Sequence, residues 1–340
     1  MGEAGEASTR APKEPLAPPE PYVFSEADQT RFANSFWRCP VRLVTGGRWA
    51  ALWRRAGTVR GGGAASSLLP VLALHGMPEA GPGGKGWTQW FYLSRRRIAR
   101  LAGLDKDTAT AAISQLLGAG LVQVESRLHE RDRMRGHLVY YRLSAGLYPV
   151  GGERFTTITG AMVYGGTWSL LPTSACRHLY LVLAARDPIG DESAYVEGAR
   201  RRIIRNAAAR RRRAGKAKGG AATSVAHEVD DQTILAHRRA KSALSLARLA
   251  DISGTRRSTL AEALRVLVSP VPDAGGNRES GEGCSAGTRP LVRKGSAVPR
   301  SPTWYAPDRS VRPWMWPVGF LNDPQQVREL QRRWVAQPAE

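Results

Sequence analysis

The sequence predicts a mainly helical α+β protein with small β-hairpins, in which one structural unit occurs twice. Three observations predict this fold class. The chain aligns with itself without a gap at an offset of 151 residues. Within each aligned copy, apolar residues recur at spacings of three and four, which is typical of the buried face of a helix. Strand-like apolar segments also follow each copy, around a basic turn after the first and beyond a Gly-rich loop after the second, and predict hairpins.

The internal repeat places residues 93–117 on residues 244–268. Eight of these 25 positions are identical. The identical pairs are Leu93/Leu244, Ser94/Ser245, Arg97/Arg248, Ala99/Ala250, Gly103/Gly254, Thr108/Thr259, Ala112/Ala263 and Leu116/Leu267. Many of these residue types begin, end or bury a helix, so chance is a poor explanation of the match.

Each copy is expected to begin with a short helix that a serine caps and a glycine ends. The side-chain oxygens of Ser94 and Ser245 can accept a hydrogen bond from a free backbone N–H at the helix start. Gly103 and Gly254 stand where a residue with positive φ commonly ends a helix. A second helix follows each glycine, and two short helices joined by such a turn form a helix-turn-helix.

The second helices are expected at residues 105–117 and 256–268, and Asp105 is expected to cap the first of them. Upstream of each copy lies a further apolar segment, at residues 66–75 and 174–185. A helix in each upstream segment would complete a core of three helices.

The predicted hairpins differ between the copies. After the first copy, strands at residues 121–124 and 137–143 flank a charged turn. After the second copy, a Gly- and Pro-rich loop at residues 269–290 comes before strands at residues 291–294 and 303–305.

Composition indicates a polyanionic partner. The 50 Lys and Arg residues outnumber the 29 Asp and Glu residues, which gives a formal net charge of +21. Basic side chains near phosphates release condensed counterions, so such an excess favours nucleic acid. Charge alone does not separate DNA from RNA, or either from an anionic membrane.

The chain is expected to be cytoplasmic. It has no run of 18 apolar residues, which predicts no transmembrane helix and no membrane partner. The first residues lack the apolar segment of a secretory signal. The three cysteines lie far apart, in neither a disulfide framework nor a zinc-binding spacing.

The expected domain organisation has four parts. Residues 1–25 are rich in Pro, Glu and Ala and predict a disordered tail. The two repeated units are expected at residues 45–150 and 165–310, followed by a C-terminal extension at residues 311–340. A basic insertion at residues 200–218, with ten basic residues and no acidic one, lies inside the second unit. Either it contacts DNA, or it is a solvated helix or linker.

The segments IARLAGLDKDTATAAISQLLGAGLV and LADISGTRRSTLAEALRVLV resemble the winged helix-turn-helix superfamily. The pattern of that superfamily in many bacterial regulators is Leu-Ala, Gly, Thr, Ala-Leu and then Gly-Leu-Val. The first copy differs by having Ile98-Ala99 and Ala112-Ile113 at two of these places, and the second lacks the glycine before its strand. The resemblance implies two winged helix-turn-helix domains in tandem.

The tandem arrangement also resembles plasmid replication initiators, which carry two winged-helix domains in one chain. This second resemblance is architectural, covers residues 45–310, and rests on no initiator-specific motif. It implies a protein associated with the bacterial nucleoid or with a plasmid.

Helices at residues 105–117 and 256–268 are expected to enter major grooves, while the hairpin turns and the basic insertion contact phosphates. The residues expected to contact duplex DNA are Lys106, Thr108, Thr110 and Ser114 on the first such helix, Arg127, Arg131, Arg133 and Arg135 in the first hairpin, Arg256, Arg257, Ser258 and Arg265 on the second such helix, Arg293 and Lys294 in the second hairpin, and Arg211 and Arg212 in the basic insertion.

No enzymatic activity, metal or cofactor is expected. The segment GPGGKG at residues 81–86 has a P-loop composition but lacks the four-residue spacing and the Ser or Thr after Lys. The six histidines are scattered, and none has a Cys or carboxylate partner at metal spacing.

Two biological roles compete on this reading. Initiation of plasmid or mobile-element replication is favoured slightly. Both large segments resemble reading heads, meaning helix-turn-helix units that contact DNA bases, and little of the chain remains for another domain. Transcriptional regulation is the alternative, since a regulator commonly joins one reading head to a ligand-binding or dimerisation domain. A third class is an RNA-binding or chromatin-like architectural protein. Replication or transcription machinery is an expected partner in the first two roles, and the oligomeric state stays open.

Overall fold

The structure is a computed structural model, which describes residues 25–27, 30, 35–45, 50–51, 63–76, 86–128, 137–187, 192–213, 230–241, 243–271, 290–295, 303–307 and 322–337. The predicted disordered tail lies outside the described residues except for residue 25. The described chain is mainly helical with small antiparallel sheets, so the expected α+β class is confirmed at this level.

In chain order, the elements are β1 (Phe36–Pro40), α2 (Val41–Thr45), α4 (Ala64–Ala73), β2 (Phe91–Tyr92), α5 (Arg95–Ala102), α6 (Lys106–Gly118), β3 (Val122–Leu128), β4 (His137–Leu143), η2 (Ala145–Leu147), β5 (Phe155–Thr159), α7 (Gly160–Tyr164), α8 (Thr167–Leu170), α9 (Ser174–Arg186), α10 (Glu192–Arg213), α12 (Asp231–Lys241), α13 (Leu246–Ser253), α14 (Arg257–Val268), β6 (Val292–Gly295), β7 (Trp304–Pro307) and α16 (Pro324–Ala336).

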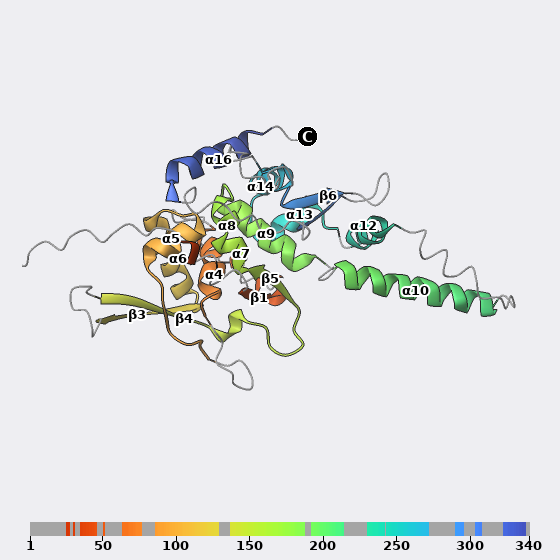
Figure 1. The fold of residues 1–340 in the computed structure, drawn as a ribbon, viewed down its shortest axis with the longest axis horizontal. Coiled ribbons are helices and arrows are strands. Elements are labelled where there is room, and N and C mark those ends of the chain that lie inside the picture. The colour runs from red at the N-terminus through yellow and green to blue at the C-terminus, as the bar shows by residue number, and fades with distance from the viewer. Residues whose placement is uncertain are drawn as a thin grey trace, which may run out of the picture.

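The first repeated unit consists of α4, β2, α5 and α6, followed by the hairpin of β3 and β4. The strands form an antiparallel sheet in the order β2-β4-β3. Phe91 and Val124 both pair with Tyr141 of the central strand. This hairpin extends away from the body of the molecule, at the lower left of Figure 1. The strand β3 is longer than expected because pairing with β4 continues through Glu125 and Arg127.

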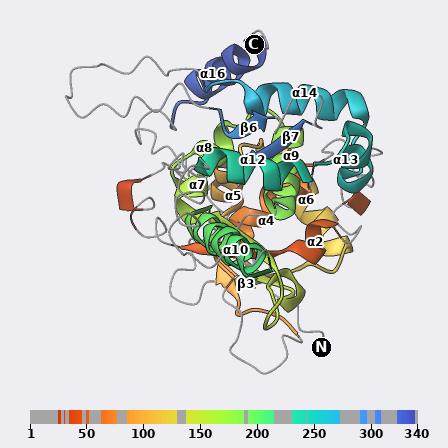
Figure 2. The ribbon, with the colours of Figure 1, turned by 90° about the vertical axis from the view of Figure 1, so that its right-hand side faces the viewer.

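The second repeated unit consists of α9, α13 and α14, followed by the antiparallel pair of β6 and β7. The helices α10 and α12 come between α9 and α13 and pack against each other through Val196 and Leu235. Figure 1 shows α10 extending from the body on the side opposite the β3–β4 hairpin. In Figure 2, α14 and α16 lie along the top of the molecule, and β3 lies near its bottom.

One hydrophobic core runs through both units. The helix α9 packs against α4 of the first unit and α14 of the second. Leu68 of α4, Leu179 of α9 and Leu267 of α14 are all buried within this core. The ranges predicted as separate domains, 45–150 and 165–310, therefore share one core.

Several elements have no counterpart among the sequence-based expectations. β1 pairs antiparallel with β5, and Trp37 of β1 is buried and donates its indole N–H to the carbonyl oxygen of Leu147 at 2.9 Å. The short helices α7 and α8 follow β5, and Trp168 of α8 donates to the carbonyl oxygen of Ser67 at 2.7 Å. The helix α16 forms within the expected C-terminal extension and buries Leu330 and Trp334.

Within the described residues, no helix combines the length and the apolar character that a membrane crossing requires.

Candidate nucleic-acid interface

The two helix pairs α5–α6 and α13–α14 begin in the same way. The hydroxyl of Ser94 accepts a hydrogen bond from the backbone N–H of Arg97 at 3.3 Å, and the hydroxyl of Ser245 accepts one from Arg248 at 3.2 Å. Both serines therefore cap a helix start as expected. Each accepts a hydrogen bond from a backbone N–H that has no partner within the helix.

The turns within the two helix pairs are also alike. Gly103 ends α5 with φ 62°, and Gly254 ends α13 with φ 69°. A side chain at either position would be strained, because L-residues rarely adopt this left-handed conformation. The expected glycine turns are confirmed at both positions.

The faces that the second helices turn to the core match as well. Ala112 and Leu116 of α6 are fully buried, and the equivalent Ala263 and Leu267 of α14 are 1% and 0% exposed. The internal repeat is therefore structural, since aligned positions share caps, turn geometry and burial.

The outer side of α6 offers few free hydrogen-bond donors. Lys106 and Ser114 are exposed, while Thr108 and Thr110 are partly buried. The hydroxyl of Thr110 donates to the carbonyl oxygen of Lys106 at 2.9 Å, and that of Ser114 donates to Thr110 at 3.2 Å. Because each hydroxyl already donates its hydrogen to the backbone, its oxygen can act only as an acceptor for a further partner.

Thr108 has a structural task at the start of α6. Its backbone N–H and its hydroxyl both donate to the Asp105 carboxylate, at 2.8 and 2.5 Å. These hydrogen bonds from Thr108 lower the pKa of Asp105. The first turn of α6 thus carries a stable negative charge.

The start of α14 has the opposite charge. Arg256 occupies the position equivalent to Asp105, and its side chain makes no cap hydrogen bond. Arg256, Arg257 and Ser258 are all exposed. Two adjacent guanidinium groups therefore stand where the first unit has a carboxylate, which makes α14 the more suitable of the two helices for phosphate or guanine contacts.

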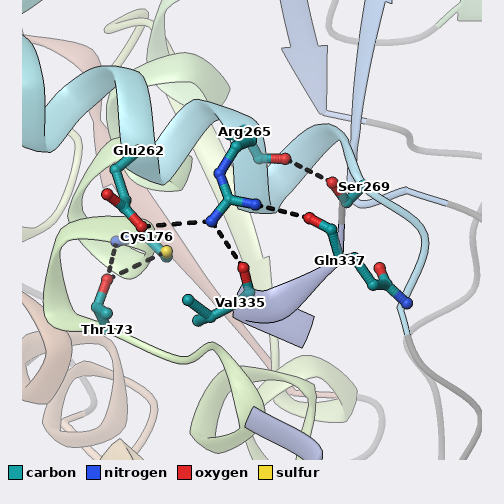
Figure 3. A network of polar contacts seen from close by, with 7 residues as sticks. All are labelled: Thr173, Cys176, Glu262, Arg265, Ser269, Val335 and Gln337. Atoms are coloured by element: carbon teal, nitrogen blue, oxygen red, sulfur yellow. Dashed lines mark hydrogen bonds and ion pairs between the residues drawn. The ribbon is translucent and has the colours of Figure 1, made fainter. Parts of the chain in front are cut away.

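Arg265 does not lie where the sequence predicted. It was expected to face DNA, but its guanidinium donates to the carbonyl oxygens of Val335 and Gln337, both at 2.7 Å (Figure 3). It also pairs with Glu262 at 3.3 Å. The carbonyls at the end of α16 have no partner within their own helix and carry partial negative charge, so they attract this guanidinium. Arg265 joins α14 to α16 instead of reaching outward.

A cluster of arginine and aromatic side chains lies on the outer face of the β2-β4-β3 sheet. It consists of Trp87, Trp90, Arg127, Tyr140 and Arg142. The guanidinium of Arg142 lies 4.7 Å from the ring centre of Trp90 and 5.4 Å from that of Trp87. The guanidinium of Arg127 lies 5.3 Å from Trp90 and 5.2 Å from Tyr140. Such cation–π contacts hold both arginines against the sheet.

The two arginines of this cluster also have polar partners on the sheet. Arg127 pairs with Glu125 at 2.8 Å, and Arg142 donates to the side-chain oxygen of Gln123 at 2.6 Å. Arg127 is exposed but already has a carboxylate partner, so its charge is partly offset. Arg142 and the two tryptophans were not among the residues predicted to contact DNA. They could have been found from the alternation of side chains along a strand. Trp90 and Tyr92 lie two residues apart, as do Tyr140 and Arg142, which places each pair on one face of the sheet.

The remaining expected residues of the first hairpin, Arg131, Arg133 and Arg135, lie outside the described residues. In the second hairpin, Arg293 is partly buried and Lys294 is exposed, and they pair in register with Ala306 and Tyr305.

The basic insertion is helical over all of its described length, residues 200–213, because α10 continues to Arg213. The backbone of Arg211 and Arg212 belongs to α10, while their side chains lie outside the described residues. Nearer the body, Arg200 pairs with Asp231 of α12 at 2.6 Å, and Arg201 pairs with Glu197. Acidic neighbours thus offset part of the charge of this helix.

Two adjacent residues of α9 tie the two helix pairs together. Arg177 is buried and donates to the carbonyl oxygens of Trp168 at 2.8 Å and Gly103 at 3.4 Å. His178 is buried, and its Nε2 lies 2.7 Å from the carbonyl oxygen of Ser253. Burial lowers the pKa of Arg177 to about 10 and that of His178 to about 4. The sequence analysis assigned neither residue a role.

Among the described residues, no three His, Cys, Asp or Glu side chains gather as metal ligands. Comparison with protein-family models, curated protein sequences and solved structures finds no match to this chain.

Proposed function

We propose that the chain binds duplex DNA through two winged helix-turn-helix reading heads that share one core. The observation that carries this proposal is the internal repeat, whose two copies have equivalent caps, glycine turns and buried faces. The first unit also supports the proposal, because its helix-turn-helix is followed by a hairpin, which is the arrangement that the resemblance implies. The net charge of +21 supports a polyanionic partner.

The proposed chemistry assigns a different task to each reading helix. Exposed Arg256 and Arg257 of α14 suit bidentate contacts to guanine O6 and N7, or phosphate contacts. Lys106 and Ser114 of α6 offer one charge and one hydroxyl beside the carboxylate of Asp105. Contacts of α14 with DNA should therefore contribute more affinity than those of α6. The contacts of α6 should mainly extend the DNA sequence that is recognised.

The biological role proposed is initiation of plasmid or mobile-element replication. Each of the two parts contains a copy of the repeated helix pair, and among the described residues both copies contribute to one common core. An initiator needs a single chain that recognises a composite origin site, and two fused reading heads meet that need. No catalytic step is assigned to the protein.

The experiment that tests this proposal is selection of bound duplexes from a random library, followed by mobility shifts on the selected site. We expect a specific site to emerge, and Arg256→Gln with Arg257→Gln to weaken its binding far more than binding to random duplex. Equal weakening on both would indicate that α14 supplies charge only. Failure of the wild-type chain to bind any duplex would exclude the proposed function.

A further inference from the structure

A groove lies between the C-terminal helix α16 and the first helix pair. Arg96 and Arg100 of α5, Lys106 of α6 and Arg328 of α16 line it. Figure 1 shows the N-terminal end of α16 above α5. Four basic side chains from three helices therefore surround one open groove at the turn of the first helix pair.

The helix α16 is held firmly in place beside this groove. Leu330 and Trp334 are 3% and 0% exposed, and Gln331 donates to the carbonyl oxygen of Ser169 at 3.1 Å. At its far end, the last carbonyls of α16 accept hydrogen bonds from Arg265 of α14. The helix that carries Arg328 is therefore anchored to α8 and α14.

The described residues that line the groove carry a net positive charge. Asp105 is the acidic side chain among its described lining residues, and both of its oxygens accept hydrogen bonds from Thr108. Arg328 is exposed, whereas Glu329, the acidic residue next to it, pairs with Arg332 at 2.8 Å. Four basic groups thus face one carboxylate that is already engaged. Such a surface attracts a phosphate and repels a cation.

We infer that this groove binds a backbone phosphate of the DNA strand that runs beside α6, and that Arg328 is one of its ligands. The inference rests on the proposed DNA-binding function and extends the interface to α16, a helix outside both repeated units. Arginine suits this task, because its planar guanidinium can contact two phosphate oxygens at once.

A pair of matched variants tests the inference. Arg328→Gln removes a charge in the groove, and Arg332→Gln removes an equal charge one turn further along α16, where the side chain pairs with Glu329 and does not line the groove. The measurement is the slope of log Kobs against log salt concentration for binding of the full-length protein to duplex DNA. Thermal unfolding of each variant checks that α16 stays docked.

We expect Arg328→Gln to reduce the magnitude of the slope by about 1, the value for one lost phosphate contact. Arg332→Gln should leave the slope unchanged, and Arg328→Lys should retain it. Equal slopes for Arg328→Gln and the wild type, or equal losses for the two glutamine variants, would overturn the inference while leaving duplex binding intact. Absence of duplex binding by the wild type would instead overturn the proposed function, and this inference with it.

Discussion

His178 of α9 lies 2.7 Å, through Nε2, from the carbonyl oxygen of Ser253, the last residue of α13. The neighbouring Arg177 donates to the carbonyl oxygen of Gly103, which ends α5. One helix therefore contacts the turns of both helix pairs. The two helix pairs therefore contribute to one hydrophobic core, in which α9 packs against both units.

The shared core predicts a fixed spacing between the two parts of the DNA site. Inserting about 5 base pairs, half a helical turn, between the half-sites should abolish simultaneous binding by both heads. The measurement is a mobility shift on a series of sites with increasing spacers. Equal affinity at every spacing would contradict a fixed relation between α6 and α14.

Burial of His178 predicts acid sensitivity. Its folded-state pKa of about 4 lies below the ordinary value of 6.5, so the folded protein favours neutral His178. Protonation of this residue therefore favours the unfolded state. Its full contribution to the free energy of unfolding is present above about pH 6.5, and about 3 kcal/mol is lost as the pH falls toward 4. Denaturant unfolding between pH 7 and 4 measures this loss. His178→Gln, which cannot titrate, should show a smaller decrease than the wild type, and an equal decrease would count against the assignment.

Gly103 is predicted to be far less tolerant of substitution than Gly120. Both have positive φ, at 62° and 68°. A Cβ on Gly103 would lie 2.3 Å from Nη2 of Arg177 and 2.4 Å from the carbonyl oxygen of Ser169, whereas a Cβ on Gly120 meets nothing within 4 Å.

Gly120→Ala should therefore cost only the backbone strain, about 1 kcal/mol, and Gly103→Ala should cost at least about twice as much. The free energy of unfolding of the two variants, measured side by side, decides the matter. Similar values would show that Arg177 and Ser169 can move aside.

Arg257 and Arg265 lie on the same helix but should respond differently to substitution. Arg257 is exposed, and Arg257→Ala should weaken binding to the specific site by about 1–3 kcal/mol without loss of stability. Arg265 bonds to the end of α16, so Arg265→Ala should lower the free energy of unfolding. Thermal melts and mobility shifts on both variants measure the two effects. A large affinity loss for Arg265→Ala with unchanged stability would restore it as a DNA contact.

The repeated units were predictable because their signals are local. A serine cap, a glycine turn and apolar spacing each lie within a few residues, so Ser94, Gly103 and their equivalents could be assigned from the sequence. The pairing of β1 with β5 joins strands more than a hundred residues apart, as in Phe36 with Thr159, and leaves no local pattern.

The position of Arg265 could not be predicted for a related reason. Its partners, Val335 in the last turn of α16 and Gln337 just after it, lie at the end of a helix that was not predicted. A signal for α16 was present, because Asp323 precedes Pro324 at the helix start and Val327, Leu330 and Trp334 follow at spacings of three and four. The contact between α16 and α14, in contrast, depends on tertiary packing alone.

We expect one chain to read two different half-sites. The exposed starts of α6 and α14 differ, with Asp105 in one and Arg256 in the other, so the two half-sites should differ in sequence. The most direct test is footprinting of a monomeric preparation on the selected site, repeated with each half-site scrambled. We expect one chain to protect both halves of a non-palindromic site, and each scrambling to remove protection of its own half and weaken the other. A palindromic site, protected only by a dimer with one reading head in each chain unused, would contradict the claim and favour a transcriptional regulator.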